Sequence, residues 1–268
     1  MTKGAISNIL RSLRILYVAD TVRFWIYRLK NSASNNEFLQ QNPEVRLPPD
    51  YLMYEAFRLN YRLYYDGGKQ TAQWLAGIIE HYCPLENKRI LDWGCGPGRV
   101  IRHMPALAGQ GSELYGTDYN QESIRWCSQN LPGIQFSVNT LSPALAFEAN
   151  YFDVIYGLSI ITHLSEAMHY GWYTELYRVL RPGGILILSS QGDNFTGKLT
   201  KNELETYVQD KLVVRGKVKE GHRTYSAFHP AGFMRRLFNN ATILGHITRE
   251  PEGDNLPQDL WIVQKPVS

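Results

Sequence analysis

The sequence ILDWGCGPGRV occupies residues 90–100. An apolar run enters a turn with glycine at alternate positions, and the pattern predicts a buried strand, a tight turn and then a helix. Glycine has no Cβ, so these positions can adopt positive φ and let a ligand approach the main chain closely. The free N–H groups at the start of the following helix would face that ligand. The turn therefore predicts a binding site for a polar cofactor.

Strand and helix patterns alternate on both sides of this turn. Apolar runs predict strands at 89–93, 113–117, 134–138, 152–157, 184–189, 242–248 and 259–264. Helical spacing predicts helices at 99–107, 121–129, 166–180 and 230–239. Such alternation is typical of a parallel sheet with helices on both faces. We predict an α/β fold, a doubly wound and mostly parallel seven-stranded sheet of Rossmann-like type with an N-terminal helical extension.

Charged residues near the turn indicate which cofactor it suits. A dinucleotide-binding turn has glycine at the third position after Gly96, where this chain has Arg99. The carboxylate of Asp92 would repel a pyrophosphate, but it suits a turn organised around a cationic ammonium group. Asp118 ends the second predicted strand, 20 positions after Gly98, where a ribose diol finds its acceptor. Arg99 and Asp92 thus disfavour a pyrophosphate, while Asp118 suits a ribose.

The order strand, Asp-x-Gly-x-Gly-x-Gly, helix, strand, Asp resembles the cofactor half of the class I S-adenosylmethionine-dependent methyltransferases. The segment FDVIY at 152–156 resembles the fourth strand of that family. The passage from Leu176 to Leu180, followed by RPGG at 181–184, resembles its helix-to-strand passage. The resemblance covers about residues 70–190 and implies S-adenosylmethionine as the cofactor.

Cofactor-binding residues follow from the resemblance position by position. It places the turn residues under the methionine portion, Asp118 on the ribose hydroxyls and Tyr119 beside the adenine. Many family members have an acid after the third strand, where this chain has Asn139, whose side chain can accept from the adenine amine. The expected set is Asp92, Gly94, Cys95, Gly96, Gly98, Asp118, Tyr119, Asn139, Thr140, Leu141 and Ser159.

The acceptor is expected at the carboxyl end of the fourth strand, over residues 157–164, because ligands of open α/β sheets bind beyond the strand ends. His163 is the nearest candidate catalytic base for a hydroxyl acceptor. A histidine here can instead serve only to bond the backbone, and methyl transfer, an in-line displacement, does not require a base. The stretch has no Asn-Pro-Pro-Tyr motif, which disfavours methylation of amide or base nitrogens.

Two domains are predicted, at 1–68 and 69–268. The first contains a basic amphipathic helix at 5–30, a connector at 31–50 closed by Leu47-Pro48-Pro49, and a tyrosine-rich helical cap that breaks at 66–68. The basic helix suits either a lipid surface or packing on its own domain or a second subunit. The second domain contains an acceptor-pocket insertion at about 191–228. The tyrosines Tyr51, Tyr54, Tyr61, Tyr64 and Tyr65 either close over the cofactor or pack as core.

The composition of the chain narrows the classes of partner that it could bind. The first 30 residues carry six basic residues and one acidic residue, a charge of +5, so the rest of a chain whose net charge is +3 carries −2. A slightly acidic body disfavours nucleic acid as a partner. The three cysteines have no disulfide or metal-ligand spacing, which suits reduced thiols in the cytoplasm and predicts no metal. No apolar stretch has the length of a membrane span, and charges interrupt any signal-peptide core.

The outer motifs, from Leu47-Pro48-Pro49 to the segment QDLW at 258–261, are similar to a bacterial methyltransferase group associated with polysaccharide and other glycan biosynthesis. This resemblance implies methylation of a sugar hydroxyl, within the wider expectation of a small-molecule or glycan hydroxyl, and the basic N-terminal helix would suit work in the cytoplasm near the inner face of the membrane. A methyltransferase acting on protein or RNA, and a cofactor-binding protein without catalysis, are the alternatives.

Overall fold

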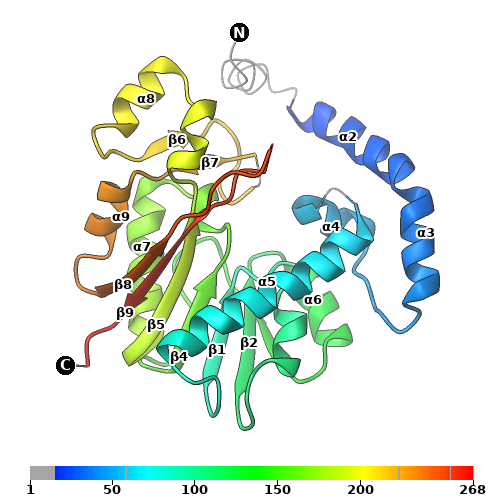
Figure 1. The fold of residues 1–268 in the computed structure, drawn as a ribbon, viewed down its shortest axis with the longest axis horizontal. Helices are drawn as coiled ribbons and strands as arrows, with labels where there is room; N and C mark the ends of the chain where they lie inside the picture. Colours follow the sequence, from blue (N-terminus) through cyan, green and yellow to red (C-terminus); the bar gives the residue numbers. More distant parts are fainter. Residues whose placement is uncertain (1–15, 58, 223, 254, 268) are drawn as a thin grey trace. The chain divides into compact units, whose positions relative to one another are not determined.

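The computed structural model of the chain describes residues 16–57, 59–222, 224–253 and 255–267 (Figure 1). This part contains a seven-stranded sheet with the order β3-β2-β1-β4-β5-β9-β8 and a two-stranded sheet of β6 and β7. The predicted doubly wound, mostly parallel sheet is confirmed. The chain divides into two compact units, Ile15–Val138 and Asn139–Ser268. The domain division at residue 68 stays a prediction.

The unit Ile15–Val138 contains three parallel strands and the glycine turn. Its strands are β1 (Arg89–Trp93), β2 (Glu113–Asp118) and β3 (Ile134–Val138). Its helices are α2 (Leu16–Lys30), α3 (Ser32–Gln41), α4 (Asp50–Phe57), α5 (Tyr61–Tyr82), the 3-10 helix η1 (Ile101–Ala106) and α6 (Gln121–Asn130). The β1 strand is buried from Ile90 to Trp93, and Asp92 is the charged residue within this buried stretch.

Residues 31–50 do not form the predicted connector, because α3 occupies Ser32–Gln41. Tertiary contacts stabilise this helix against its weak local propensity. The Asn35 side chain donates to the carbonyl of Leu59 and accepts from the backbone N–H of Tyr61, and Phe38 is fully buried. The polar composition of residues 31–50 therefore gave a wrong prediction, because the Asn35 side chain is buried and both donates and accepts a hydrogen bond.

The predicted break at 66–68 is also wrong, because α5 continues through it. A Cβ at Gly68 would lie 2.3 Å from the carbonyl oxygen of Arg99, so glycine lets the helix approach the backbone that follows the turn. The helix predicted at 99–107 is instead the shorter 3-10 helix η1, with Pro105 inside it. Proline lacks the N–H that a longer α-helix would need.

Of the basic helix predicted at 5–30, residues 5–15 lie outside the described residues. In α2, Phe24 and Tyr27 pack on Tyr54, while Trp25, Ile26 and Leu29 are exposed. The contact of residues 5–30 with lipid or a second subunit stays a prediction. Among the residues that the structure describes, no helix combines the length and apolarity that crossing a membrane demands.

The unit Asn139–Ser268 contains the parallel pair β4 (Phe152–Gly157) and β5 (Leu180–Ser190), followed by antiparallel strands β9 (Asp259–Gln264) and β8 (Thr242–Ile247). Its α-helices are α7 (Glu166–Val179), α8 (Lys201–Tyr207) and α9 (Ala231–Leu237). Its 3-10 helices are η2 (Ile161–His163) and η3 (Asp193–Lys198).

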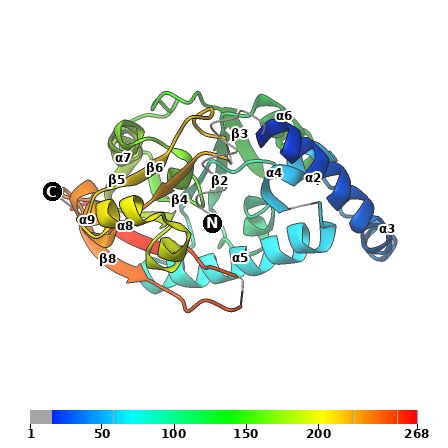
Figure 2. The same cartoon turned by 90° about the horizontal axis from the view of Figure 1, so that it is seen from above.

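The predicted insertion at 191–228 folds as η3, α8 and a hairpin of β6 (Val213–Arg215) and β7 (Ser226–Phe228). Figures 1 and 2 show α8 beside this hairpin, next to the carboxyl end of β5. The β7 strand contacts η2, which follows β4. The insertion therefore lies at the edge of β4 and β5 where ligands of such sheets bind.

Candidate active site

The glycine turn has the backbone conformation that its sequence predicts. Gly94, Gly96 and Gly98 have φ angles of 76°, 52° and 79°, in the left-handed region that favours glycine. The backbone N–H groups of Gly94 and Cys95 both donate to the carbonyl of Thr117 in β2, at 2.8 and 2.9 Å. The turn is thus fixed to the end of the neighbouring strand.

Asp118 connects the turn to the end of β2. Its Oδ2 accepts from the backbone N–H of Gly96 at 2.8 Å, and its Oδ1 accepts from that of Asn120 at 2.7 Å. Burial raises the pKa of this carboxyl, and the backbone N–H groups of Asn120, Gly96 and Tyr119 oppose that rise. A carboxylate has about four acceptor sites, so beside these three N–H groups it retains capacity to accept from a ribose hydroxyl.

The turn leaves room for a ligand at Gly96 but not at Gly98. A Cβ built on Gly96 meets no atom within 4 Å, so this face of the turn is open. A Cβ on Gly98 would lie 2.6 Å from Leu131, and one on Gly116 would lie 2.7 Å from the ring of Phe136. Gly98 and Gly116 therefore allow neighbouring side chains to pack directly against the backbone. The open side of Gly96, beside the Asp118 carboxylate, fits the polar end and ribose of S-adenosylmethionine.

The base of the turn is buried and polar. Asp92 is 4% exposed at the end of β1. Burial lowers the pKa of Arg99, and electrostatic interactions with Tyr64 and Asp92 oppose that shift. The hydroxyl of Tyr64 donates to the carbonyl of Pro97 at 2.7 Å. Tyr64 and Tyr54 are buried in one apolar cluster, so these two tyrosines are core residues.

Cys95 lies under the turn as a small buried side chain. Burial raises the pKa of its thiol well above the usual range, and the charges of Asp92 and Asp118 add to the rise. Burial likewise raises the pKa of Cys127 to about 12. Both thiols therefore stay protonated at neutral pH, and neither has the low pKa of a reactive cysteine.

The residues predicted to surround the adenine follow β2 and β3. Tyr119 comes directly after Asp118 and is half-buried. The Nδ2 of Asn139 donates to the carbonyl of Thr140, while its Oδ1 is buried and accepts no hydrogen bond from the described residues. The carbonyl of Leu141 accepts from the indole of Trp172 at 3.1 Å. A buried carbonyl oxygen without a donor fits an acceptor for the adenine amine.

Ser159 follows β4 with a φ of 63°, a conformation that non-glycine residues rarely adopt. Its backbone N–H donates to Oγ of Ser189 at 2.7 Å, and its hydroxyl donates to Oε1 of Gln258 at 3.0 Å. Both polar groups of this predicted cofactor-binding residue are therefore engaged within the protein. Its role toward the cofactor stays a prediction.

His163 has the tautomer that a general base needs. Its Nδ1 lies 2.7 Å from the carbonyl oxygen of Tyr225, which can only accept, so Nδ1 carries the proton. Burial lowers the pKa of the ring, which is therefore neutral at pH 7. Nε2 retains its lone pair and forms no hydrogen bond with the described residues. The ring thus bonds the backbone and can also accept a proton.

A second pair of histidines, which the sequence did not suggest as a pair, lies buried in the same unit. His169 and His229 are each 1% exposed, and their Nε2 atoms lie 2.9 Å apart. Nδ1 of His169 donates to the carbonyl of Ser165. Burial lowers the pKa of His169 to about 4 and that of His229 well below its usual value. The pair is a neutral structural contact.

The buried pair of His169 and His229 predicts that the folded protein loses stability as the pH falls. Above about pH 6.5 both folded and unfolded chains keep His169 neutral, so its full contribution to stability is present. Between about 6.5 and 4 the unfolded chain alone binds the proton, and the free energy of unfolding falls by up to about 1.4 kcal/mol per pH unit for this residue. Denaturant titrations at several pH values measure the slope. A His169→Gln protein with the same slope would contradict the assignment.

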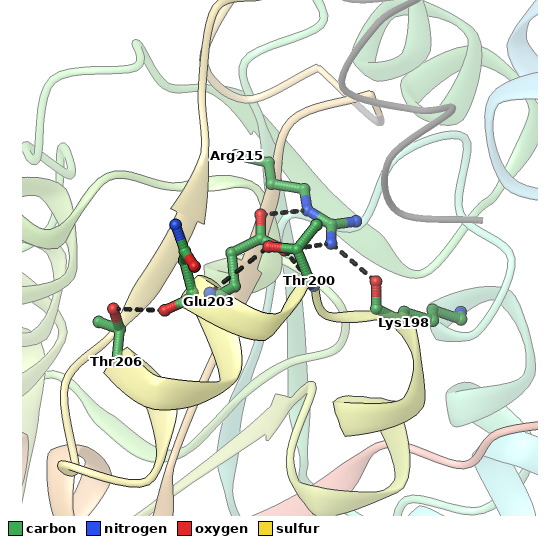
Figure 3. Close-up of polar contacts among 6 residues, drawn as sticks. Lys198, Thr200, Glu203, Thr206 and Arg215 are labelled. Atoms are coloured by element: carbon green, nitrogen blue, oxygen red, sulfur yellow. Dashed lines mark hydrogen bonds and ion pairs between the residues drawn. The ribbon is translucent and has the colours of Figure 1, made fainter. Parts of the chain in front are cut away.

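A buried ion pair holds the insertion together (Figure 3). Arg215 of β6 is 8% exposed, and its Nε and Nη2 donate to both carboxylate oxygens of Glu203 in α8, at 2.8 and 2.7 Å. Nη2 also donates to the carbonyl of Lys198, and Thr200 caps α8 through a reciprocal bond with Glu203. Burial would raise the pKa of Glu203, but hydrogen bonds from Arg215 and Thr200 lower it to about 2.

An Arg215→Met protein is expected to lose roughly 2 kcal/mol of stability, because it leaves the Glu203 carboxylate without its partner. The Glu203→Gln, Arg215→Met double variant should recover part of the loss, since no unpaired charge remains. Chemical denaturation of the three proteins measures both steps. Equal stability of the parent and the Arg215→Met variant would show that the ion pair contributes nothing.

Comparison with known proteins identifies one domain of the chain. Residues 90–184 match the family model described as a methyltransferase domain. An S-adenosylmethionine-dependent methyltransferase of Methanosarcina mazei has the same fold, with 21% identity over 71% of this chain and 98% of that one and a TM-score of 0.54. A protein of Pyrococcus horikoshii covers 82% of this chain and 100% of its own, at 17% identity and a TM-score of 0.56. The match shows a methyltransferase domain at residues 90–184, and the solved structures show that the chain has the fold of such a domain.

Curated relatives match about two fifths of the chain. A ubiquinone biosynthesis O-methyltransferase of Cereibacter sphaeroides is 30% identical over 114 residues, which is 41% of this chain and 44% of that protein. A sterol 24-C-methyltransferase of Schizosaccharomyces pombe is 32% identical over 116 residues, 40% of this chain and 30% of that protein. The chain thus spans less than half the length of these relatives.

Proposed function

We propose that the protein transfers a methyl group from S-adenosylmethionine to a hydroxyl oxygen of a small-molecule or glycan acceptor. The observation that carries the proposal is the tautomer of His163, a neutral ring with Nδ1–H bound to the carbonyl of Tyr225 and the Nε2 lone pair available. A hydroxyl, unlike an apolar carbon, has a proton that such a base can take. The name of the Cereibacter relative, an O-methyltransferase, supports an oxygen acceptor.

In the proposed reaction the acceptor oxygen forms a bond to the methyl carbon while the bond from that carbon to the sulfonium sulfur breaks. Nε2 of His163 takes the hydroxyl proton, so the products are the methyl ether and neutral S-adenosylhomocysteine. When bound, the cofactor supplies an electrophilic methyl group that needs no further activation. The residues of the chain hold the cofactor through the glycine turn and Asp118, and they align and desolvate the reactants.

Transfer from S-adenosylmethionine carrying a labelled methyl group tests the proposal with a panel of acceptors: caffeate, UDP-glucose, GDP-mannose and a sterol. We expect label on a hydroxyl of one of the first three. A His163→Ala protein should lose about 100-fold in kcat, the contribution typical of a general base, with unchanged affinity for S-adenosylhomocysteine. Because the pKa of His163 is lowered, the parent should keep its activity at pH values below 6.5.

Three outcomes count against the proposal. Unchanged turnover in His163→Ala removes the base. Methylation of the sterol alone favours a carbon acceptor, as the name of the Schizosaccharomyces relative suggests. Tight binding of S-adenosylhomocysteine without transfer to any acceptor favours a cofactor-binding protein without catalysis.

A further inference from the structure

Three polar side chains form a closed hydrogen-bonded group at the carboxyl ends of β4 and β5. Ser159 follows β4, Ser189 is the next-to-last residue of β5, and Gln258 directly precedes β9. The backbone N–H of Ser159 donates to Oγ of Ser189, and the hydroxyls of both serines lie within 3.0 Å of Oε1 of Gln258. This edge of the sheet is where an acceptor is expected to bind.

Hydrogen bonds to the N–H, the hydroxyl and the carbonyl of Ser159 hold this residue in an unfavourable backbone conformation. Besides the two bonds to Ser189 and Gln258, its carbonyl accepts from the hydroxyl of Thr162 at 2.8 Å. Its φ of 63° lies in the left-handed region, which is unfavourable for a residue with a side chain. Strain of this kind persists where surrounding contacts enforce it, and it is concentrated at functional sites.

The same bonds fix which end of the Gln258 amide faces inward. Oγ of Ser189 accepts the N–H of Ser159, so its own proton is available for Oε1 of Gln258, 2.6 Å away. Oε1 then receives two hydroxyl donors and is saturated. The two N–H bonds of Nε2 have no acceptor among the described residues, and the residue is only half-buried.

The backbone before Gln258 is anchored as well. Nδ2 of Asn194, in the insertion, donates to the carbonyls of Arg249 and Pro257, at 2.8 and 3.1 Å. Asp259, the next residue, pairs with Ser190 in the sheet. The amide of Gln258 is therefore ordered before any ligand arrives, which removes an entropic cost that a mobile side chain would add to binding.

We propose that Gln258 determines acceptor specificity, by donating from Nε2 to an acceptor oxygen other than the one that is methylated. The inference rests on the proposed function and narrows it to polyoxygenated acceptors, such as sugar rings or catechol-like rings. A site built to bond a substrate oxygen discriminates strongly against analogues without that oxygen. Ser159 and Ser189 are positioning residues, because they act through the amide.

Nuclear magnetic resonance of the full chain, ¹⁵N-labelled and saturated with S-adenosylhomocysteine, tests this directly. The side-chain amide signals of Gln258 are assigned by their loss in a Gln258→Glu protein, whose carboxylate can still accept from both serines. We expect UDP-glucose or caffeate to shift these signals, and cyclohexanol, which has a single oxygen, to leave them in place. Signals unmoved by both oxygen-rich probes, or moved equally by cyclohexanol, overturn the inference.

Steady-state kinetics give a second test. The acceptor is UDP-glucose or caffeate, whichever of the two the parent methylates. Gln258→Glu should raise the KM for that probe about 10- to 100-fold, with a smaller change in kcat and unchanged affinity for S-adenosylhomocysteine. Gln209→Glu, the same charge change at an exposed position, is the control and should leave KM unchanged. A KM within twofold of the parent overturns the inference. A parent that methylates neither probe counts against the proposed function, while the amide shifts still decide the role of Gln258.

Discussion

A Gly96→Arg protein is expected to lose binding of S-adenosylhomocysteine by at least about 100-fold. The side chain would start from a position whose Cβ faces open space beside Asp118, so it would fill the volume that the cofactor needs. The φ of 52° adds a modest backbone cost for any residue other than glycine. Isothermal titration calorimetry measures the loss, and thermal unfolding shows whether the protein remains folded.

Gly77→Arg is the matched control for this experiment. Gly77 is exposed in α5, and a Cβ there also meets no atom within 4 Å, so the same side chain is added away from the turn. Its affinity should equal that of the parent. If Gly96→Arg binds as tightly as Gly77→Arg, the open face of the turn is not the cofactor site.

Asp118→Ala is expected to weaken the same binding by about 100-fold and to lower stability by about 2 kcal/mol. Affinity falls because the ribose loses its acceptors, and stability falls because the N–H groups of Gly96 and Asn120 lose theirs. Calorimetry and chemical denaturation measure the two effects separately.

Asp118→Asn distinguishes the two contributions. The amide keeps one acceptor oxygen and removes the charge, so stability should lie between those of the parent and the alanine variant, and so should affinity. An Asp118→Ala protein that binds S-adenosylhomocysteine as tightly as the parent would show that this carboxylate does not hold the ribose.

Much of the sheet could be predicted from sequence because its strands are set by local pattern. The run ILDW, the glycines after it and Asp118 all lie in adjacent segments, and the structure confirms the turn between them. The helix α3 and the unbroken α5 were missed for a common reason. Asn35 bonds to residues near position 60, and Gly68 packs against Arg99, so both elements depend on contacts distant in sequence.

The candidate site also contains some residues that could be identified from local sequence and others that could not. Residues of the glycine turn could be identified because a tight turn near a ligand needs glycine at particular positions. The role of Gln258 could not, since its partner Ser159 lies 99 positions away and a glutamine before a strand has no local signature. The Arg215–Glu203 pair is likewise evident only once α8 and β6 are folded together.

An experimental structure of the protein with S-adenosylhomocysteine would show whether the glycine turn and Asp118 hold the cofactor. We expect the ribose hydroxyls within about 3.2 Å of the Asp118 carboxylate oxygens, with the amino-acid end of the ligand over Gly96. A ligand bound elsewhere, or a ribose that does not contact Asp118, would contradict this expectation.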